Sequence, residues 1–352
     1  MAALPLAKTG LTVLLALLLL AEPALPARAE QRLWQRGFIL WSPHAGYPTP
    51  EVLQSIRALR GVGASHVALL VTWYVDNPGA SEIHRRPDTP TDVELQAAAQ
   101  EARRLGLEIV LVLHVNCQDG SWRATIEPND TDRWFDQYAS IVDHYAAMAE
   151  RWGAAGMMVG AELIKLSAPP HTQRWRRIIG IARSRFHGFL TYSANWGSNA
   201  PPGQPDPLEE FSSIEFWPEL DYIGIAAYFE LHEGGGAGRG NQMASWQDWK
   251  RRKLEPLHER YGKPILFTEI GYRSARGAAV HPWDYGDDDP DPKLQADLYS
   301  ALLDYWRNEP WLAGIYFWHW PVDSVSEASD YSPLGKLAEN VVRYWFRFLA
   351  RP

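Results

Sequence analysis

Eight short apolar runs alternate along this chain with segments that have the spacing of amphipathic helices, and this alternation constrains the fold more than any other feature. Short continuous apolar runs are typical of strands buried on both faces of a parallel sheet. Strand–helix units that repeat in this way and close on themselves predict an α/β fold, a single (β/α)8 TIM barrel. We assign the strands to residues 38–41, 66–72, 107–114, 157–160, 189–192, 222–226, 264–269 and 312–318.

The intervening segments carry helix signals. Thr49, Pro50 and Glu51 form a typical helix start, with an N-cap, a proline at the first position and an early acid. A doubly wound sheet is the alternative fold, but no Gly-x-Gly-x-x-Gly follows the first strand. We interpret the glycine-rich segment 234–240 as a lid or solvated insertion. The expected helices are 49–60, 91–105, 134–152, 172–186, 246–261, 294–306 and 335–349, with a short helical segment at 208–216.

The first 29 residues have the pattern of a secretory signal. Lys8 precedes an apolar run from Leu11 to Leu20, and Ala27-Arg28-Ala29 is a small-residue cleavage site. The apolar run is too short for a comfortable membrane span, so stable membrane insertion is not expected. An uncleaved membrane anchor is the alternative. The sequence therefore predicts cleavage near Ala29, a secreted or periplasmic protein, and a catalytic domain over 30–352.

Charge and cysteine content exclude several classes of protein. A net charge of −8 argues against binding to nucleic acid or anionic membranes through bulk charge. The single cysteine, Cys117, excludes an internal disulfide and a cysteine-based zinc site. No His-x-His or His-Glu-x-x-His spacing occurs, which disfavours a metal-dependent hydrolase, and we expect no cofactor. The acidic segment Asp284–Asp291 is either a calcium site or a solvated loop.

Two of the apolar runs end in a glutamate. Residues 156–161 lead to Glu162 and residues 264–268 lead to Glu269, at the ends of the fourth and seventh expected strands. Catalytic residues of (β/α)8 enzymes lie at the C-terminal ends of the strands. Either glutamate alone could be a salt-bridging residue, whereas two together favour a glycosidase pair of proton donor and nucleophile. A Tyr hydroxyl and an Arg guanidinium near the nucleophile would help to keep it ionised.

Other polar and aromatic residues follow the expected strands. Trp41 and Trp73, at the tips of the first and second strands, are either sugar platforms or packing residues of the rim. His114 either lines the pocket or is a hydrogen-bonded structural residue. Asn195 and Trp196, at the tip of the fifth strand, are stronger pocket candidates because the polar member has reason to face a ligand.

Four segments together resemble glycoside hydrolase family 113, whose characterised members are β-1,4-mannanases. The similarity extends from Gly37 to about Asn340 and implies a retaining (β/α)8 enzyme. By this resemblance Glu162 is the general acid/base, Glu269 the nucleophile, Tyr228 a hydrogen-bond donor to the nucleophile, and Trp318 a platform beneath the sugar. The segments are EFWPELDYIGIAAY at 215–228, FTEIGY at 267–272, GIYFWHW at 314–320 and DYSPLGK at 330–336.

One position departs from the wider superfamily of such enzymes. An asparagine that contacts the sugar 2-hydroxyl commonly precedes the acid/base, and this chain has Ala161 there. With the signal-like first 29 residues, the resemblance predicts an exported retaining glycosidase that cleaves within a polysaccharide or oligosaccharide substrate. Its sugar is a β-1,4-mannan or, alternatively, a glucan, a xylan or a bacterial exopolysaccharide. An inactive carbohydrate-binding barrel is the alternative from another class, which Ala161 favours and the two carboxylates oppose.

Overall fold

Eight parallel strands form a closed barrel in which neighbours in the chain are neighbours in the sheet and β8 pairs with β1. The computed structural model describes residues 34–41, 47, 49–197, 206–231, 239–284, 286, 289–323 and 325–349. This confirms the predicted (β/α)8 fold. The strands are β1 Gln35–Trp41, β2 His66–Val75, β3 Glu108–Cys117, β4 Gly156–Ala161, β5 Phe189–Asn195, β6 Ile223–Ala226, β7 Ile265–Ile270 and β8 Leu312–Pro321.

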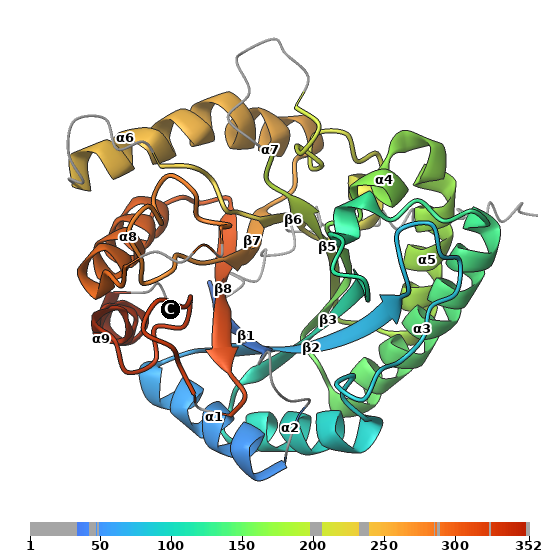
Figure 1. Ribbon diagram of the computed structural model, residues 1–352, viewed down its shortest axis with the longest axis horizontal. Helices are drawn as coiled ribbons and strands as arrows, with labels where there is room; N and C mark the ends of the chain where they lie inside the picture. The colour runs from blue at the N-terminus through green and yellow to red at the C-terminus, as the bar shows by residue number, and fades with distance from the viewer. Residues whose placement is uncertain are drawn as a thin grey trace, which may run out of the picture. The chain divides into compact units, whose positions relative to one another are not determined.

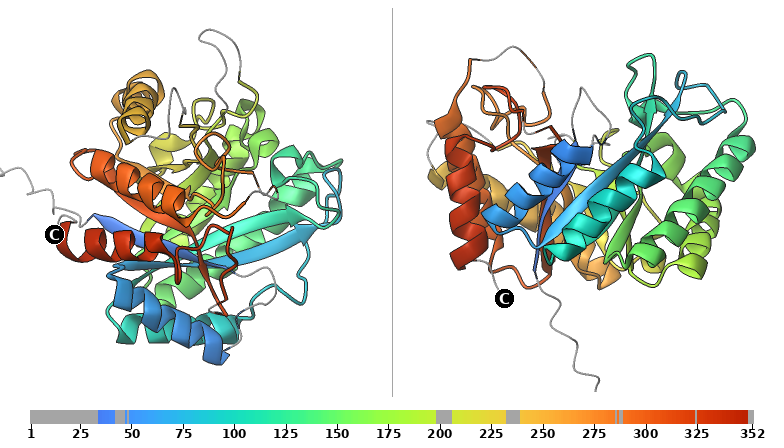
Figure 2. Two further views of the ribbon diagram at one scale, coloured as in Figure 1. Left: turned by 60° about the vertical axis from the view of Figure 1, so that its left-hand side comes forward. Right: turned by 90° about the horizontal axis from the view of Figure 1, so that it is seen from below.

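Helices surround the barrel and cover the outer faces of its strands, as the view along the barrel in Figure 1 shows. Figure 2 shows them running alongside the strands. Because both faces of each strand are covered, every strand except at its ends consists of buried residues. The principal helices are α1 Thr49–Val62, α2 Asp92–Arg104, α3 Thr131–Trp152, α5 Thr172–Arg185, α6 Arg239–Trp249, α7 Glu255–Tyr261, α8 Pro292–Trp306 and α9 Leu337–Tyr344. Shorter turns are α4 Ile164–Ser167, η1 Arg123–Thr125, η2 Pro169–His171 and η3 Trp217–Glu219, with π-helical turns η4 Lys250–Leu254 and η5 Trp345–Leu349.

Local sequence explains where these helices begin and end. At α2 the Thr91 side chain accepts from the Glu94 amide at 3.3 Å, and Glu94 accepts from the Thr91 amide at 2.7 Å, which is a capping box. Asp130 caps α3 in a similar way through the Arg133 amide. Gly153 ends α3 with a φ of 62°, in the left-handed region that glycine adopts readily.

Three predicted helices differ from the structure. The expected segment 208–216 is not helical, because Trp196 pairs with Glu209 in an isolated bridge and only η3 follows. The expected helix 246–261 starts earlier, at Arg239, and contains the π-turn η4 next to Pro256, a residue that cannot donate to the helix ladder. The last helix begins at Leu337 because Gly335 has a φ of +73°.

The sheet is irregular next to both predicted catalytic strand tips. Register shifts occur between Met158 and Ala161 on β4 and between Phe267 and Ile270 on β7. Such irregularities redirect side chains and are common beside active sites. They place Glu162 and Glu269 at the same end of the barrel, where the loops after the strands gather.

The expected signal segment 1–29 lies outside the described residues, as does 234–238 of the glycine-rich segment. The described residues all belong to one compact unit, Leu33–Pro352. Within them, no helix has the length and apolar character needed to cross a lipid bilayer.

Candidate active site

Glu162 directly follows β4 and is held in an uncommon backbone conformation. Its φ is 52°, and it is the only described residue other than glycine with a positive φ. Its amide donates to the Ser193 carbonyl of β5 at 2.8 Å, and its side chain is buried. Non-glycine residues in this region carry strain and cluster at functional sites, so the turn sets the direction of the Glu162 carboxyl.

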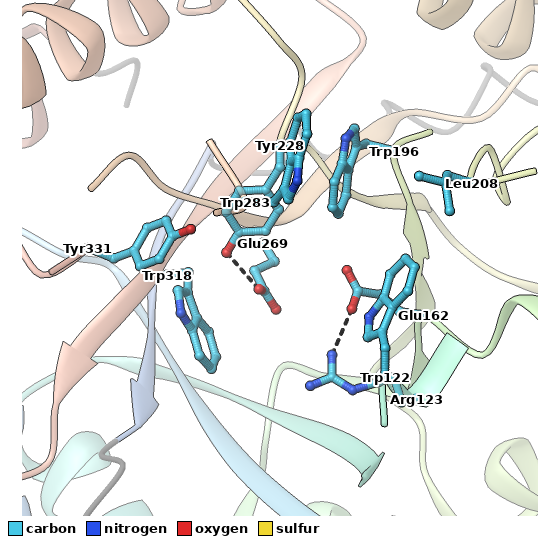
Figure 3. A pocket seen from close by; sticks show the side chains of 10 residues that line it. All are labelled: Trp122, Arg123, Glu162, Trp196, Leu208, Tyr228, Glu269, Trp283, Trp318 and Tyr331. Atoms are coloured by element: carbon cyan, nitrogen blue, oxygen red, sulfur yellow. Dashed lines mark hydrogen bonds and ion pairs between the residues drawn. The ribbon is translucent and has the colours of Figure 1, made fainter. Parts of the chain in front are cut away.

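Glu269 lies near the end of β7 and is 8% exposed. The hydroxyl of Tyr228, which follows β6, donates to Glu269 Oε1 at 2.7 Å. The hydrogen bond that the family resemblance implied between these two residues is therefore present. It leaves the other carboxyl oxygen of Glu269 turned towards the cavity, as Figure 3 shows.

Arg123 brings a positive charge to Glu162. It belongs to η1 in the loop after β3, and its Nη1 donates to Glu162 Oε2 at 2.8 Å while its Nε donates to Asn116 Oδ1 at 2.8 Å. The Asn116 contact fixes the plane of the guanidinium, so the ion pair with Glu162 has a defined geometry. The guanidinium that we expected beside the nucleophile thus pairs with the other carboxylate.

The two carboxyl groups influence each other electrostatically. Burial, together with the nearby charge of Glu162, raises the pKa of Glu269 to about 7. The charge of Arg123 and the hydrogen bond from Tyr228 act in the opposite direction. The raised pKa therefore falls on Glu269, the carboxyl that the family resemblance assigns as nucleophile.

A cavity of about 460 Å³ opens between the tips of β4 and β7. Figure 3 shows Glu162 and Glu269 facing it from opposite sides, with Trp318 beside Glu269 and Trp122 beside Glu162. Large aromatic faces alternate with charged groups around the space, a lining suited to sugar rings, which offer both apolar faces and hydroxyls. The lining residues are Trp122, Arg123, Glu162, Trp196, Leu208, Tyr228, Glu269, Trp283, Trp318 and Tyr331.

Five sequence-predicted site residues meet at this cavity: Glu162, Glu269, Tyr228, Trp318 and Trp196. The ring of Trp196 packs against Tyr228 and Trp283, with distances between ring centroids of 5.3 Å and 5.6 Å. These aromatic residues therefore form one continuous wall. The peptide bond from Trp318 to His319 is cis.

Four other predicted residues do not line the cavity. Asn195 is fully buried, and its Oδ1 accepts from the Gly197 amide at 3.2 Å. His114 is buried, and that burial, with the charge of Arg123, holds its pKa well below the usual range. Trp41 packs against Trp318, with the two ring centroids 5.0 Å apart. Trp73 donates to the Tyr145 hydroxyl at 3.4 Å.

Sequence reasoning missed Arg123, Trp122, Trp283, Leu208 and the position of Tyr331 in the wall. Trp122 and Arg123 are adjacent in a polar loop, and a Trp–Arg pair just after a strand tip is the signal that could have drawn attention to them. Trp283 and Leu208 lie in loops whose paths no local pattern defines.

Metal binding finds no support among the described residues, where no group of three His, Cys, Asp or Glu side chains could hold an ion. Asp287 and Asp288 of the acidic segment are outside the described residues, so the calcium hypothesis stays untested. The cavity itself offers two carboxyls, a guanidinium and a phenol, which suffice for acid–base and nucleophilic chemistry.

A comparison with protein-family models identifies one family for this chain. The model of Glycoside Hydrolase Family 113 matches residues 38–336. The GH113 β-mannanase AaManA from Alicyclobacillus acidocaldarius, solved in complex with ManMIm, is similar with 28% identity and a TM-score of 0.76 over 89% of this chain and 97% of its own.

More distant structures share the fold. A GH113 β-1,4-mannanase is 24% identical with a TM-score of 0.75 over 90% of this chain and 99% of its own. An endo-1,4-β-D-mannanase from Thermotoga petrophila is 13% identical with a TM-score of 0.58, over 90% and 100% of the two chains. No curated protein matches the chain.

Proposed function

Because the chain belongs to glycoside hydrolase family 113 and is a glycoside hydrolase, we propose that it is a retaining β-1,4-mannanase that cleaves within mannan-type chains. The main support for this proposal is that Glu162 and Glu269, at the tips of β4 and β7, line one cavity. The wall of this cavity includes Trp318 and Tyr228. The similar solved structures named above are described as β-mannanases.

The proposed reaction has two displacements. Glu269 attacks the anomeric carbon while Glu162 gives its proton to the departing glycosidic oxygen, and a glycosyl–enzyme ester forms. Glu162 then removes a proton from water, which attacks the same carbon and releases Glu269 as a carboxylate. Tyr228 supports the ionised form of Glu269 through its hydrogen bond.

The ion pair of Arg123 and Glu162 defines what substrate binding has to change. A proton donor must be neutral before it protonates the leaving group. We therefore propose that sugar hydroxyls entering the cavity take over hydrogen bonds of Arg123, so that Glu162 can carry the proton.

Ala161 presents no polar atom where the superfamily commonly has asparagine, and Asn195 does not line the cavity. This leaves open the alternative that the same mechanism acts on a glucan, a xylan or an exopolysaccharide. It is also the observation behind the alternative of an inactive binding barrel.

A panel of polysaccharides tests these proposals. We expect reducing ends to appear from β-1,4-mannan, and the first product seen by proton NMR to have the β-configuration. The Glu269→Ala variant should lose about 10⁴-fold or more in activity, because no nucleophile remains. Added azide should then give the inverted glycosyl azide. Mannan hydrolysis that persists in Glu269→Ala would refute the assignment of the nucleophile.

We also propose that the chain is exported, on the basis of its signal-like first 29 residues. Expression of the full chain in a bacterial host with a general secretion system should place the protein outside the cytoplasm. Its N-terminus, determined by mass spectrometry, should be Glu30. A cytoplasmic protein that retains residues 1–29 would contradict export.

A further inference from the structure

A further buried carboxyl lies outside the cavity lining. Glu210, in the loop between β5 and β6, is 0% exposed. The Tyr192 hydroxyl donates to its Oε1 at 2.6 Å, the Asn195 amide donates to its Oε2 at 2.7 Å, and Ser167 provides a further hydrogen bond. No described Lys or Arg forms an ion pair with Glu210, so its partners are neutral donors.

Tyr192 connects this carboxyl to the turn that carries Glu162. The Leu163 amide, which directly follows Glu162, donates to the Tyr192 hydroxyl at 2.7 Å. The Tyr192 hydroxyl therefore accepts a hydrogen bond from the Leu163 amide and donates one to Glu210. Removal of either member would leave a buried polar group without its partner.

The Glu210 contacts join three pieces of backbone next to the site. They are the strained turn at Glu162, the tip of β5 just before the cavity residue Trp196, and α4 through Ser167. A carboxylate is well suited to this position because it accepts hydrogen bonds from several converging donors. Burying a carboxyl without a cation partner is costly, and the three hydrogen bonds to Glu210 offset part of that cost.

We propose that Glu210 and Tyr192 are positioning residues that hold Glu162 in the orientation needed for proton transfer to the leaving group. This inference rests on the proposed function, because it assigns Glu162 as the acid/base. Neither residue lines the cavity, so both act through the backbone amides of Leu163 and Asn195.

Burial, together with the charge of Glu162, raises the pKa of Glu210 to about 7. The hydrogen bonds from Ser167, Tyr192 and the Asn195 amide act in the opposite direction. A neutral Glu210 could no longer accept from all of these donors, so the positioning effect is expected to be greatest when Glu210 is ionised.

The test uses matched tyrosine variants. Tyr192→Phe removes the connecting hydroxyl, and Tyr138→Phe is the control, because the Tyr138 hydroxyl is equally buried and donates to the Val159 carbonyl at 2.7 Å in the same aromatic cluster. We expect kcat on mannan to fall about 10- to 100-fold in Tyr192→Phe with KM changed less than about twofold. Tyr138→Phe should lose a similar amount of thermal stability but retain its kcat.

Two further measurements separate positioning from general damage. Aryl glycosides with good leaving groups need little proton donation. On these substrates the ratio of wild-type kcat to Tyr192→Phe kcat should therefore approach one. In a Glu162→Ala background, adding Tyr192→Phe should cause almost no further loss, because residues that act as a unit are not additive. A loss independent of leaving group, or fully additive with Glu162→Ala, would overturn the proposal.

Glu210→Gln provides the second variant, since it keeps the side-chain size while removing one acceptor. It should show the same dependence on leaving group as Tyr192→Phe. Glu215→Gln is its control, because Glu215 lies exposed in the same loop and accepts from Thr172 at 3.0 Å. Wild-type protein that releases no sugar from any polysaccharide would refute the proposed function instead, which keeps the two failures distinct.

Discussion

At the scale of single residues, the site is defined by the unequal surroundings of two carboxyls. Glu162 has a guanidinium at 2.8 Å, whereas Glu269 has a phenol at 2.7 Å. A guanidinium carries a full positive charge, whereas a phenol hydroxyl is a neutral donor, so the two carboxyls have different electrostatic surroundings in one cavity. The raised pKa falls on Glu269, the proposed nucleophile, so the proposed roles require substrate binding to move the proton to Glu162.

The surroundings of Glu269 lead to a prediction about pH. The nucleophile must be ionised, so kcat/KM should fall about tenfold per pH unit below the pKa of Glu269 in the free enzyme. That pKa is raised to about 7. The Tyr228 hydrogen bond lowers it, and its removal in Tyr228→Phe must therefore raise the pKa and move the acid limb to higher pH.

Tyr331→Phe is the control for this measurement. Tyr331 also lines the cavity, but its hydroxyl donates to the Pro282 carbonyl at 2.6 Å. In the Tyr331→Phe variant, the acid limb of the kcat/KM profile should stay at the wild-type pH, even if the maximal rate changes. An acid limb in Tyr228→Phe that stays in place or moves to lower pH would show that Glu269 does not govern this limb.

The residues also show what sequence alone could give. Glu162 and Glu269 were predictable because each ends an apolar run, and the end of a barrel strand is a fixed place in the fold. Arg123 was not, because its position depends on Asn116 and on the path of the loop after β3. Asn195 was expected to face the ligand, but the hydrogen bond of its amide to Glu210 fixes the backbone while its side chain contacts Gly197.

At the scale of elements, strands and helices were predictable because each carries its own periodicity and end signals. The capping box at Thr91 is one example, since its donors and acceptors lie within four residues. The segment 208–216 failed as a helix because its apolar residues are buried by contacts with distant strands, and Glu209 pairs with Trp196. Tertiary contacts override local propensity in such loops.

The close approach of β7 and β8 gives a prediction at this scale. A Cβ at Gly271 would lie 2.4 Å from the Trp318 carbonyl oxygen and 3.0 Å from the Tyr331 ring. Gly271→Ala must therefore push the tips of the two strands apart, which we expect to cost about 1–3 kcal/mol of stability. Because Trp318 and Glu269 would move relative to each other, kcat should fall by about 100-fold.

Gly180→Ala is the matched control. Gly180 is exposed within α5, and a Cβ there would meet no atom within 4 Å. This substitution should stabilise the protein by roughly 0.5–1 kcal/mol because glycine is a poor helix former. Its kcat should be unchanged. Denaturant unfolding and mannan assays on both variants would contradict the prediction if Gly271→Ala retained wild-type activity.

At the scale of the whole molecule, the fold followed from the count and order of elements. A closed parallel barrel needs each strand to be buried on both faces and joined by a helix, and both requirements are visible in the sequence. The substrate does not follow from the same information, because it depends on loops such as those that carry Trp122 and Trp283.

The net charge of the chain provides a test that distinguishes neutral from anionic substrates. With a net charge of −8, the protein repels an anionic polysaccharide, and salt screens this repulsion. A neutral mannan is not repelled. For β-1,4-mannan we therefore expect kcat/KM to change by less than about twofold between low and high salt, from 0.02 M to roughly 0.5 M. For a uronic-acid polymer, kcat/KM should instead rise with salt, because screening removes the repulsion between polymer and protein. A strong fall of kcat/KM with salt on the best substrate would contradict both expectations, since it would show that a local positive charge such as Arg123 attracts an anionic sugar into the cavity.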